Sequence, residues 1–153
     1  MTQRLSASYE PDSGSDGTGK LTVTVRAGGF AGTGSAWFQE RELLELARRL
    51  SATYPLPPEG LPALRGGYWS DATPGTLAQP HVELRFYPLG PLGTVACRVE
   101  LATPVEQTDR ASAQASVGVE LLTSYEPLAK FGHSLEALVL RRASEAVLEG
   151  HTA

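Results

Sequence analysis

The sequence predicts a single α+β domain in which an antiparallel sheet of five to six strands is packed on one face by two helices. Over most of the chain, apolar residues alternate with polar ones at the period of two that half-buried strands require. In residues 39–53, and again after Ser124, apolar residues instead recur every three or four positions, as on an amphipathic helix. A length of 153 residues suits one core, so the domain is expected to span residues 1–153.

The N-terminal part of the chain is predicted to form strands joined by glycine-rich turns. Residues 1–20 are expected to be a mobile edge strand and loop, because an alternating segment leads into a stretch dense in Gly, Ser and Asp. A sharper alternation over residues 21–26 predicts the next strand. Gly28-Gly29 then tolerates the positive φ that a tight hairpin turn needs.

The return strand of this hairpin is expected over residues 30–37. It contains Gly32 and Gly34, which predict either a bulge or a close approach of other backbone, because glycine has no side chain to pack in a sheet. Trp37, at the end of the strand, is expected to lie in the core.

The first helix is predicted over residues 39–53, where leucine and alanine share one stripe and most charged residues lie off it. It ends before Pro55, because proline disfavours a helical residue at the preceding position. The segment from 55 to 80 is rich in proline and glycine. It is expected to be a long, irregular connection with one short strand near residues 64–68.

The clearest hairpin joins alternating segments at residues 82–86 and 95–101 through the turn-rich residues 88–93. Its polar face carries acidic and basic residues that could pair across the strands, so one side of the sheet is expected to face water. A polar turn over residues 103–112 leads to a further strand at residues 113–121.

The final helix is expected to begin after Ser124, which can cap it, with Pro127 in the first turn where a missing N–H is harmless. Its apolar stripe is predicted to continue as far as Arg142. Gly132, in the middle of the helix, weakens it by about 1 kcal/mol relative to alanine and predicts either close packing or a kink. Residues 150–153 are expected to form a frayed tail.

Composition and charge argue against several classes of protein. A formal net charge of −4, with Lys and Arg scattered along the chain, argues against a nucleic-acid partner. No stretch reaches the roughly 18 apolar residues of a membrane span, and residues 1–10 lack the pattern of a signal peptide. A single cysteine, Cys97, cannot close an intrachain disulfide. We therefore expect a cytoplasmic protein with no membrane partner.

The residue pattern indicates no catalytic chemistry, so no enzyme activity, catalytic residue, metal or cofactor is expected. His81, His133 and His151 are far apart and lack the spacing of metal ligands. Cys97 alternates with apolar residues on its strand, where a thiol is usually a buried hydrophobe and not a nucleophile.

The segment Arg65-Gly-Gly-Tyr-Trp-Ser-Asp71 is the strongest candidate for a binding site. We predict Arg65, Tyr68, Trp69 and Asp71 as its binding residues, because exposed Tyr, Trp and Arg most often anchor protein interfaces. The alternative interpretation is that these aromatic side chains fold back and cover one end of the core.

The polar face of the central hairpin is a second candidate site. An enzyme or a small-ligand binder could gather Glu83, Arg85, Arg98 and Glu100 on this open sheet face, provided that a concave pocket lies there. A further alternative is a homodimer that pairs through an edge strand or through the same open face.

Several of these features together resemble small bacterial immunity proteins of the WapI type. The features are Gly-Gly-Phe30-x-Gly32, Trp37-Phe38, the helix at residues 43–50, the hairpin at residues 82–101, and Leu128-x-x-Phe131-x-x-x-Leu135. The resemblance spans most of residues 20–140. It implies a cytoplasmic protein that protects a cell by binding a polymorphic toxin, and it assigns no individual functional residue.

The leading hypothesis is therefore a non-enzymatic protein-binding module, an immunity protein whose partner is a bacterial polymorphic toxin. Its binding surface is expected to include Tyr68 and Trp69.

Overall fold

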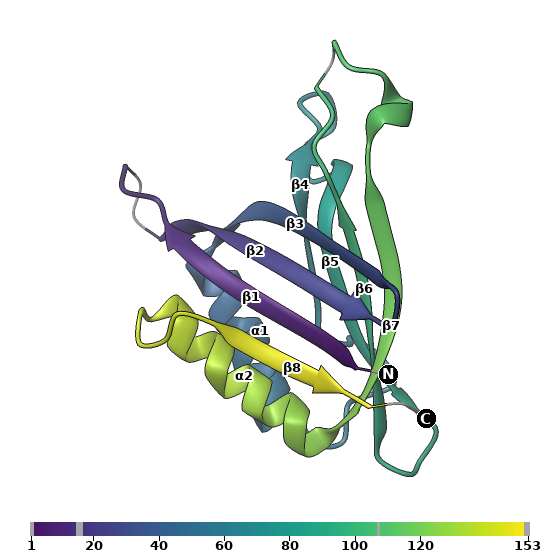
Figure 1. Cartoon of the computed structure of the whole chain (residues 1–153). Helices are drawn as coiled ribbons and strands as arrows, with labels where there is room; N and C mark the ends of the chain where they lie inside the picture. The colour runs from purple at the N-terminus through teal and green to yellow at the C-terminus, as the bar shows by residue number, and fades with distance from the viewer. Residues whose placement is uncertain (1, 15–16, 107, 152–153) are drawn as a thin grey trace.

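The computed structural model of the protein describes residues 2–14, 17–106 and 108–151. These residues form two α-helices and two antiparallel sheets of four strands each (Figure 1). The predicted α+β class is confirmed. The prediction of one sheet with five to six strands was wrong, because the strands divide between two sheets that meet at an angle.

The first sheet, sheet A, has the strand order β3-β2-β1-β8. Its strands are β1 (Gln3–Pro11), β2 (Thr18–Ala27), β3 (Phe30–Gln39) and β8 (Ala146–Gly150). β1 pairs with both β2 and β8, so the N-terminal strand lies inside the sheet and not at the predicted edge. Gly150, where the predicted tail begins, pairs with Gln3. Residues 152–153 of that tail, and 15–16 of the predicted mobile loop, lie outside the described residues.

The second sheet, sheet B, has the strand order β4-β5-β6-β7. Its strands are β4 (Ala63–Trp69), β5 (Leu77–Leu89), β6 (Thr94–Ala102) and β7 (Ser116–Ser124). The central hairpin is confirmed, with Leu84 opposite Val99 and the apolar residues of both strands on one face. The strand predicted at residues 113–121 begins later, because a 3-10 turn occupies Ala111–Ala113.

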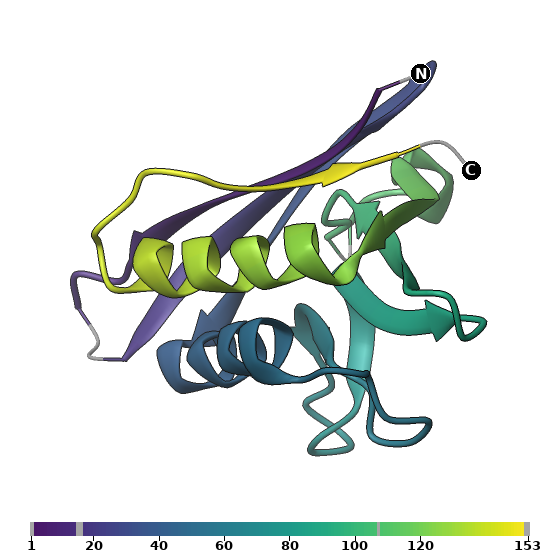
Figure 2. The same cartoon turned by 90° about the horizontal axis from the view of Figure 1, so that it is seen from below.

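Helices α1 (Glu40–Ala52) and α2 (Tyr125–Val139) pack against each other and fill the angle between the two sheets (Figure 2). α1 buries the predicted stripe of leucine and alanine. α2 follows Ser124 as predicted, but the Ser124 side chain makes no capping hydrogen bond and the helix ends before Arg142. Within the described residues, neither helix is long and apolar enough to span a membrane.

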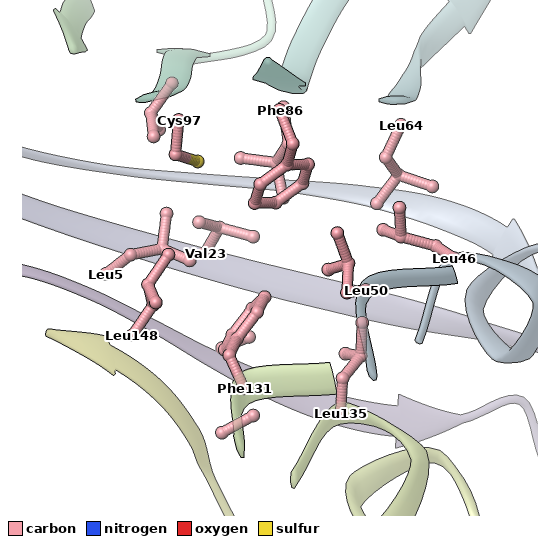
Figure 3. Packing of buried hydrophobic residues seen from close by; sticks show 14 of the residues in the cluster. Leu5, Val23, Leu46, Leu50, Leu64, Phe86, Cys97, Phe131, Leu135 and Leu148 are labelled. Carbon is pink, nitrogen blue, oxygen red and sulfur yellow. The ribbon is translucent and has the colours of Figure 1, made fainter. Parts of the chain in front are cut away.

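The two sheets and the two helices share one cluster of buried apolar side chains (Figure 3). Leu5 and Val23 come from sheet A, Phe86 and Cys97 from sheet B, and Phe131 from α2. Cys97 is buried among these residues, as its apolar neighbours in the sequence predicted.

Strand β3 crosses sheet B at close range and contacts all four of its strands. Glycines make this crossing possible. A Cβ atom at Gly34 would lie 2.5 Å from the carbonyl oxygen of His81, and one at Gly32 would lie 2.5 Å from Cγ1 of Val117. Because real Cβ atoms do not approach other atoms so closely, the predicted close approach of backbone is confirmed at Gly34, whereas Gly32 is approached by the side chain of Val117.

Candidate functional site

Three large aromatic side chains are exposed where β3 passes the end of β4. Trp37, Tyr68 and Trp69 expose 54%, 42% and 50% of their surface. The prediction that Trp37 lies in the core was wrong. Its neighbours Ala36 and Phe38 point inward, so the alternation of the strand turns Trp37 outward. Trp37 and Tyr68 line a common hollow of about 250 Å³.

The bulged end of β4 separates the predicted binding residues. The register of β4 against β5 shifts between Gly66 and Gly67, and this β-bulge changes the direction in which the following side chains point. Arg65, before the bulge, lies opposite Glu83, and its Nε is 3.2 Å from the Glu83 carboxylate. Tyr68, Trp69 and Asp71 follow the bulge and line one groove, whereas Arg65 does not line it.

This groove, the aromatic groove, has a volume of about 790 Å³ and is open to solvent. One wall consists of the end of β4 and the turn that contains Asp71. The other wall is the segment after β6, which contributes Val105 and Glu106. Figure 1 shows both loops at the same end of sheet B.

Gln79 of β5 links the segment after β6 to sheet B through hydrogen bonds. Its Nε2 donates to the carbonyl oxygen of Val105 over 3.0 Å, and its Oε1 accepts the N–H of Val105 over 2.8 Å. The same Oε1 lies 2.6 Å from Nε2 of His81. An amide oxygen can only accept, so His81 Nε2 is the donor and carries the ring proton.

His81 is buried next to the groove, at the hollow that Trp37 and Tyr68 also line, with 4% of its surface exposed. Its ring forms a T-shaped contact with the ring of Tyr68. Burial lowers the pKa of His81, and the negative charge of Glu106 partly opposes this effect. His81 thus supports Tyr68 through ring contact and Val105 through Gln79. Among the described residues, no three His, Cys, Asp or Glu side chains gather as a metal site would require.

Tyr68 joins the two walls directly. Its hydroxyl donates to Oε1 of Glu106 over 2.7 Å, and this hydrogen bond is the main reason that the pKa of Tyr68 is raised. Glu106 is itself held by Asp109, because the Glu106 N–H donates to Oδ2 of Asp109 over 3.1 Å. A backbone hydrogen bond closes the turn that contains Asp71: the Ser70 N–H donates to the carbonyl oxygen of Thr76 over 2.8 Å.

The second candidate site lies on the outer face of sheet B, around a hollow of about 270 Å³. Glu83 and Glu100 line this hollow. Each is paired with an arginine, Glu83 with Arg65 and Glu100 with Arg98, the latter over 3.4 Å. Arg85 lies opposite Arg98 on the same face. The structure therefore brings the four predicted residues onto one face, next to a concave hollow.

No family model, curated protein or solved structure matches the chain. The resemblance to immunity proteins of the WapI type therefore stays a prediction.

Four residues that were not predicted from the sequence surround Tyr68: Trp37, Gln79, His81 and Glu106. Tyr68 and Glu106 are 38 positions apart, and the segment that contains Glu106 has no motif. One local pattern in the sequence indicates part of this surface. Gln79 and His81 are alternate residues near the start of β5, so their side chains lie on the same face of the strand.

Proposed function

We propose that this protein is a non-enzymatic protein-binding module whose partner docks on the aromatic groove and on Trp37. The observation that supports this proposal is the exposure of three large aromatic side chains on one continuous surface. Tyr and Trp dominate the binding energy of many protein interfaces, because each buries a large area at a small cost in conformational entropy.

The support beneath these side chains favours binding as well. Tyr68 is held by the ring of His81 and by Glu106, and the opposite wall is held by Gln79. A surface that is ordered before the partner arrives loses less entropy on association than a flexible loop would lose.

We infer further that the partner is a bacterial polymorphic toxin and that the protein acts in the cytoplasm as its immunity protein. The resemblance to immunity proteins of the WapI type favours this kind of partner. Such a function needs only a surface that covers part of the toxin, and it requires no catalytic group from this chain.

The test is rescue of growth. A gene adjacent to the one that encodes this protein would be expressed as the toxin in a bacterial host, with and without this chain. We expect the wild-type chain to restore growth and Trp69→Ala to fail, because loss of an interface anchor costs about 2 kcal/mol or more. Leu92→Ala is the matched control, since Leu92 is a 91% exposed apolar residue in the β5–β6 turn.

Two results would overturn this proposal. If no neighbouring product is toxic or binds the chain, the immunity function is wrong. If a toxin binds but Trp69→Ala and Leu92→Ala protect equally well, the aromatic groove is not the docking surface.

The hollow on the outer face of sheet B supports a second candidate function, a small-ligand binder or an enzyme. Glu83 lines this hollow, and only 19% of its side chain is exposed. Its carboxylate pairs with Arg65. A screen of small amines by thermal unfolding would test this candidate. A ligand that stabilises the wild type but not Glu83→Gln would support it, and the absence of any such ligand would argue against it.

A further inference from the structure

The walls of the aromatic groove are acidic. Asp71 and Glu106 line it, one on each wall, and no lysine or arginine is among the described residues that line it. Lys20 lies in the neighbouring hollow, beside Trp37. Within the described residues, neither Asp71 nor Glu106 takes part in an ion pair.

Both carboxylates have capacity to bind a ligand. The hydrogen bond from Tyr68 uses Oε1 of Glu106, which leaves Oε2 for another donor. Asp71 is exposed on the turn beside Trp69. A partner that covered these carboxylates without supplying a cation would bury uncompensated charge, which is costly.

We propose that the aromatic groove binds an arginine side chain of the protein partner, with the guanidinium group against Trp69 and paired with Asp71 and Glu106. This inference rests on the proposed function, because it names the part of the partner that enters the same groove. Cations are attracted to the face of an aromatic ring, and tryptophan attracts them most strongly.

Arginine fits this groove better than other cations do. Its guanidinium is planar, so it can stack on an aromatic ring while its N–H groups reach carboxylates at the edge of the plane. Lysine presents a compact charge without a plane to stack. A metal ion is disfavoured, since no group of three suitable ligands forms among the described residues.

The test uses the tripeptide acetyl-Gly-Arg-Gly-amide, with its citrulline and lysine analogues, at constant ionic strength. Binding would be followed by NMR through the two tryptophan indole N–H signals and the backbone amide signal of Glu106. We expect the arginine peptide to shift the Trp69 and Glu106 signals along one saturable curve. The neutral citrulline peptide should leave them in place, and the lysine peptide should bind more weakly.

Substitution of the two carboxylates tests whether the arginine peptide binds in the aromatic groove. Asp71→Asn and Glu106→Gln should each weaken binding of the arginine peptide by about fivefold, because each removes one charge and keeps a similar shape. Glu106→Gln retains an oxygen that can accept from Tyr68. The matched control is Glu126→Gln on α2, which removes another exposed carboxylate far from the groove and should not change binding.

Equal shifts with the citrulline or lysine peptide, or no saturable shift at Trp69, would overturn this inference. Its failure is distinguishable from failure of the proposed function. If growth rescue depends on Trp69 but the arginine peptide does not bind, only the inference is wrong. If the peptide binds as expected but no protein partner depends on Trp69, the arginine site stands and the proposed function falls.

Discussion

The rings of Tyr68 and His81 meet in a T-shaped contact, with centroids 4.6 Å apart and ring planes at 79°. A buried side chain thereby supports an exposed one. His81 also donates to Gln79, which binds both backbone groups of Val105. One buried imidazole therefore supports both walls of the aromatic groove, and its protonation state should affect the whole surface.

Acidification from about pH 8 to about pH 5.5 is expected to reduce stability through His81. Burial lowers the pKa of His81 in the folded protein, whereas an unfolded histidine has a pKa of about 6.5. The unfolded state therefore binds more protons. The contribution of His81 is complete above the unfolded pKa and is lost as the pH falls through it towards the folded pKa. Denaturant unfolding at several pH values measures this loss.

Two variants serve as controls for this pH dependence. His81→Gln keeps an N–H group that can donate to Gln79 but does not titrate, so stability should vary less with pH in this range. His133→Gln removes an exposed histidine of α2 and should behave like the wild type. Equal pH dependence in both variants would contradict the assignment to His81.

Replacing Gly132 by alanine is expected to destabilise the protein. A Cβ atom at Gly132 of α2 would lie 2.6 Å from the carbonyl oxygen of Ala47 in α1 and 2.8 Å from the nitrogen of Ser51. Overpacking typically costs about 1–3 kcal/mol and the gain in helix propensity is about 1 kcal/mol, so we expect a net loss of up to about 2 kcal/mol. Thermal unfolding measures the change. Gly29→Ala is the control, because a Cβ atom at Gly29 would have no neighbouring atom within 4 Å. A Gly132→Ala variant more stable than the wild type would show that the two helices separate easily.

Glu40, the first residue of α1, is expected to hold two distant segments together. It accepts a hydrogen bond from the Tyr9 hydroxyl over 2.6 Å, and its carboxylate lies 3.0 Å from Nη2 of Arg141. Tyr9→Phe should cost about 1–2 kcal/mol, because the lost hydrogen bond has a charged acceptor at a partly exposed position. A double-mutant cycle with Glu40→Gln would measure the coupling. Tyr54→Phe, at an exposed tyrosine, should change stability by less than about 0.5 kcal/mol.

Cys97 is expected to resist thiol reagents in the folded protein. Its side chain has no exposed surface, and burial raises the pKa of the thiol. Since the thiolate is the reactive form, labelling should require opening of the core and should accelerate as denaturant unfolds the protein. Rapid labelling of the native protein, at the rate seen in denaturant, would show that this part of the core opens readily.

Elements with a regular local pattern could be predicted from the sequence. The hairpin of β5 and β6 followed from its alternation, and α1 followed from its stripe of leucine and alanine. The division into two sheets could not be predicted. It depends on the crossing of β3 over sheet B at Gly32 and Gly34, and a glycine in a strand does not reveal which distant backbone approaches it. β8 was not predicted either, because it is only five residues long and its partner β1 lies at the other end of the chain.

The candidate site was predictable only where its residues are close in sequence. Tyr68, Trp69 and Asp71 were predicted together, and they do share one groove. Arg65 was grouped with them because a β-bulge cannot be recognised from a pair of glycines alone. Glu106 reaches the groove through the folding of a segment without a motif, and Trp37 joins the surface because of the direction in which β3 alternates.

The pairing of Gln3 with Gly150 brings both ends of the described chain to one corner of the molecule. Figure 1 shows this corner at the opposite end of the fold from the loops that form the aromatic groove. A fusion partner or an affinity tag at either terminus would therefore leave the groove unobstructed. Immobilisation through such a tag would present the same face of every molecule to a partner in solution.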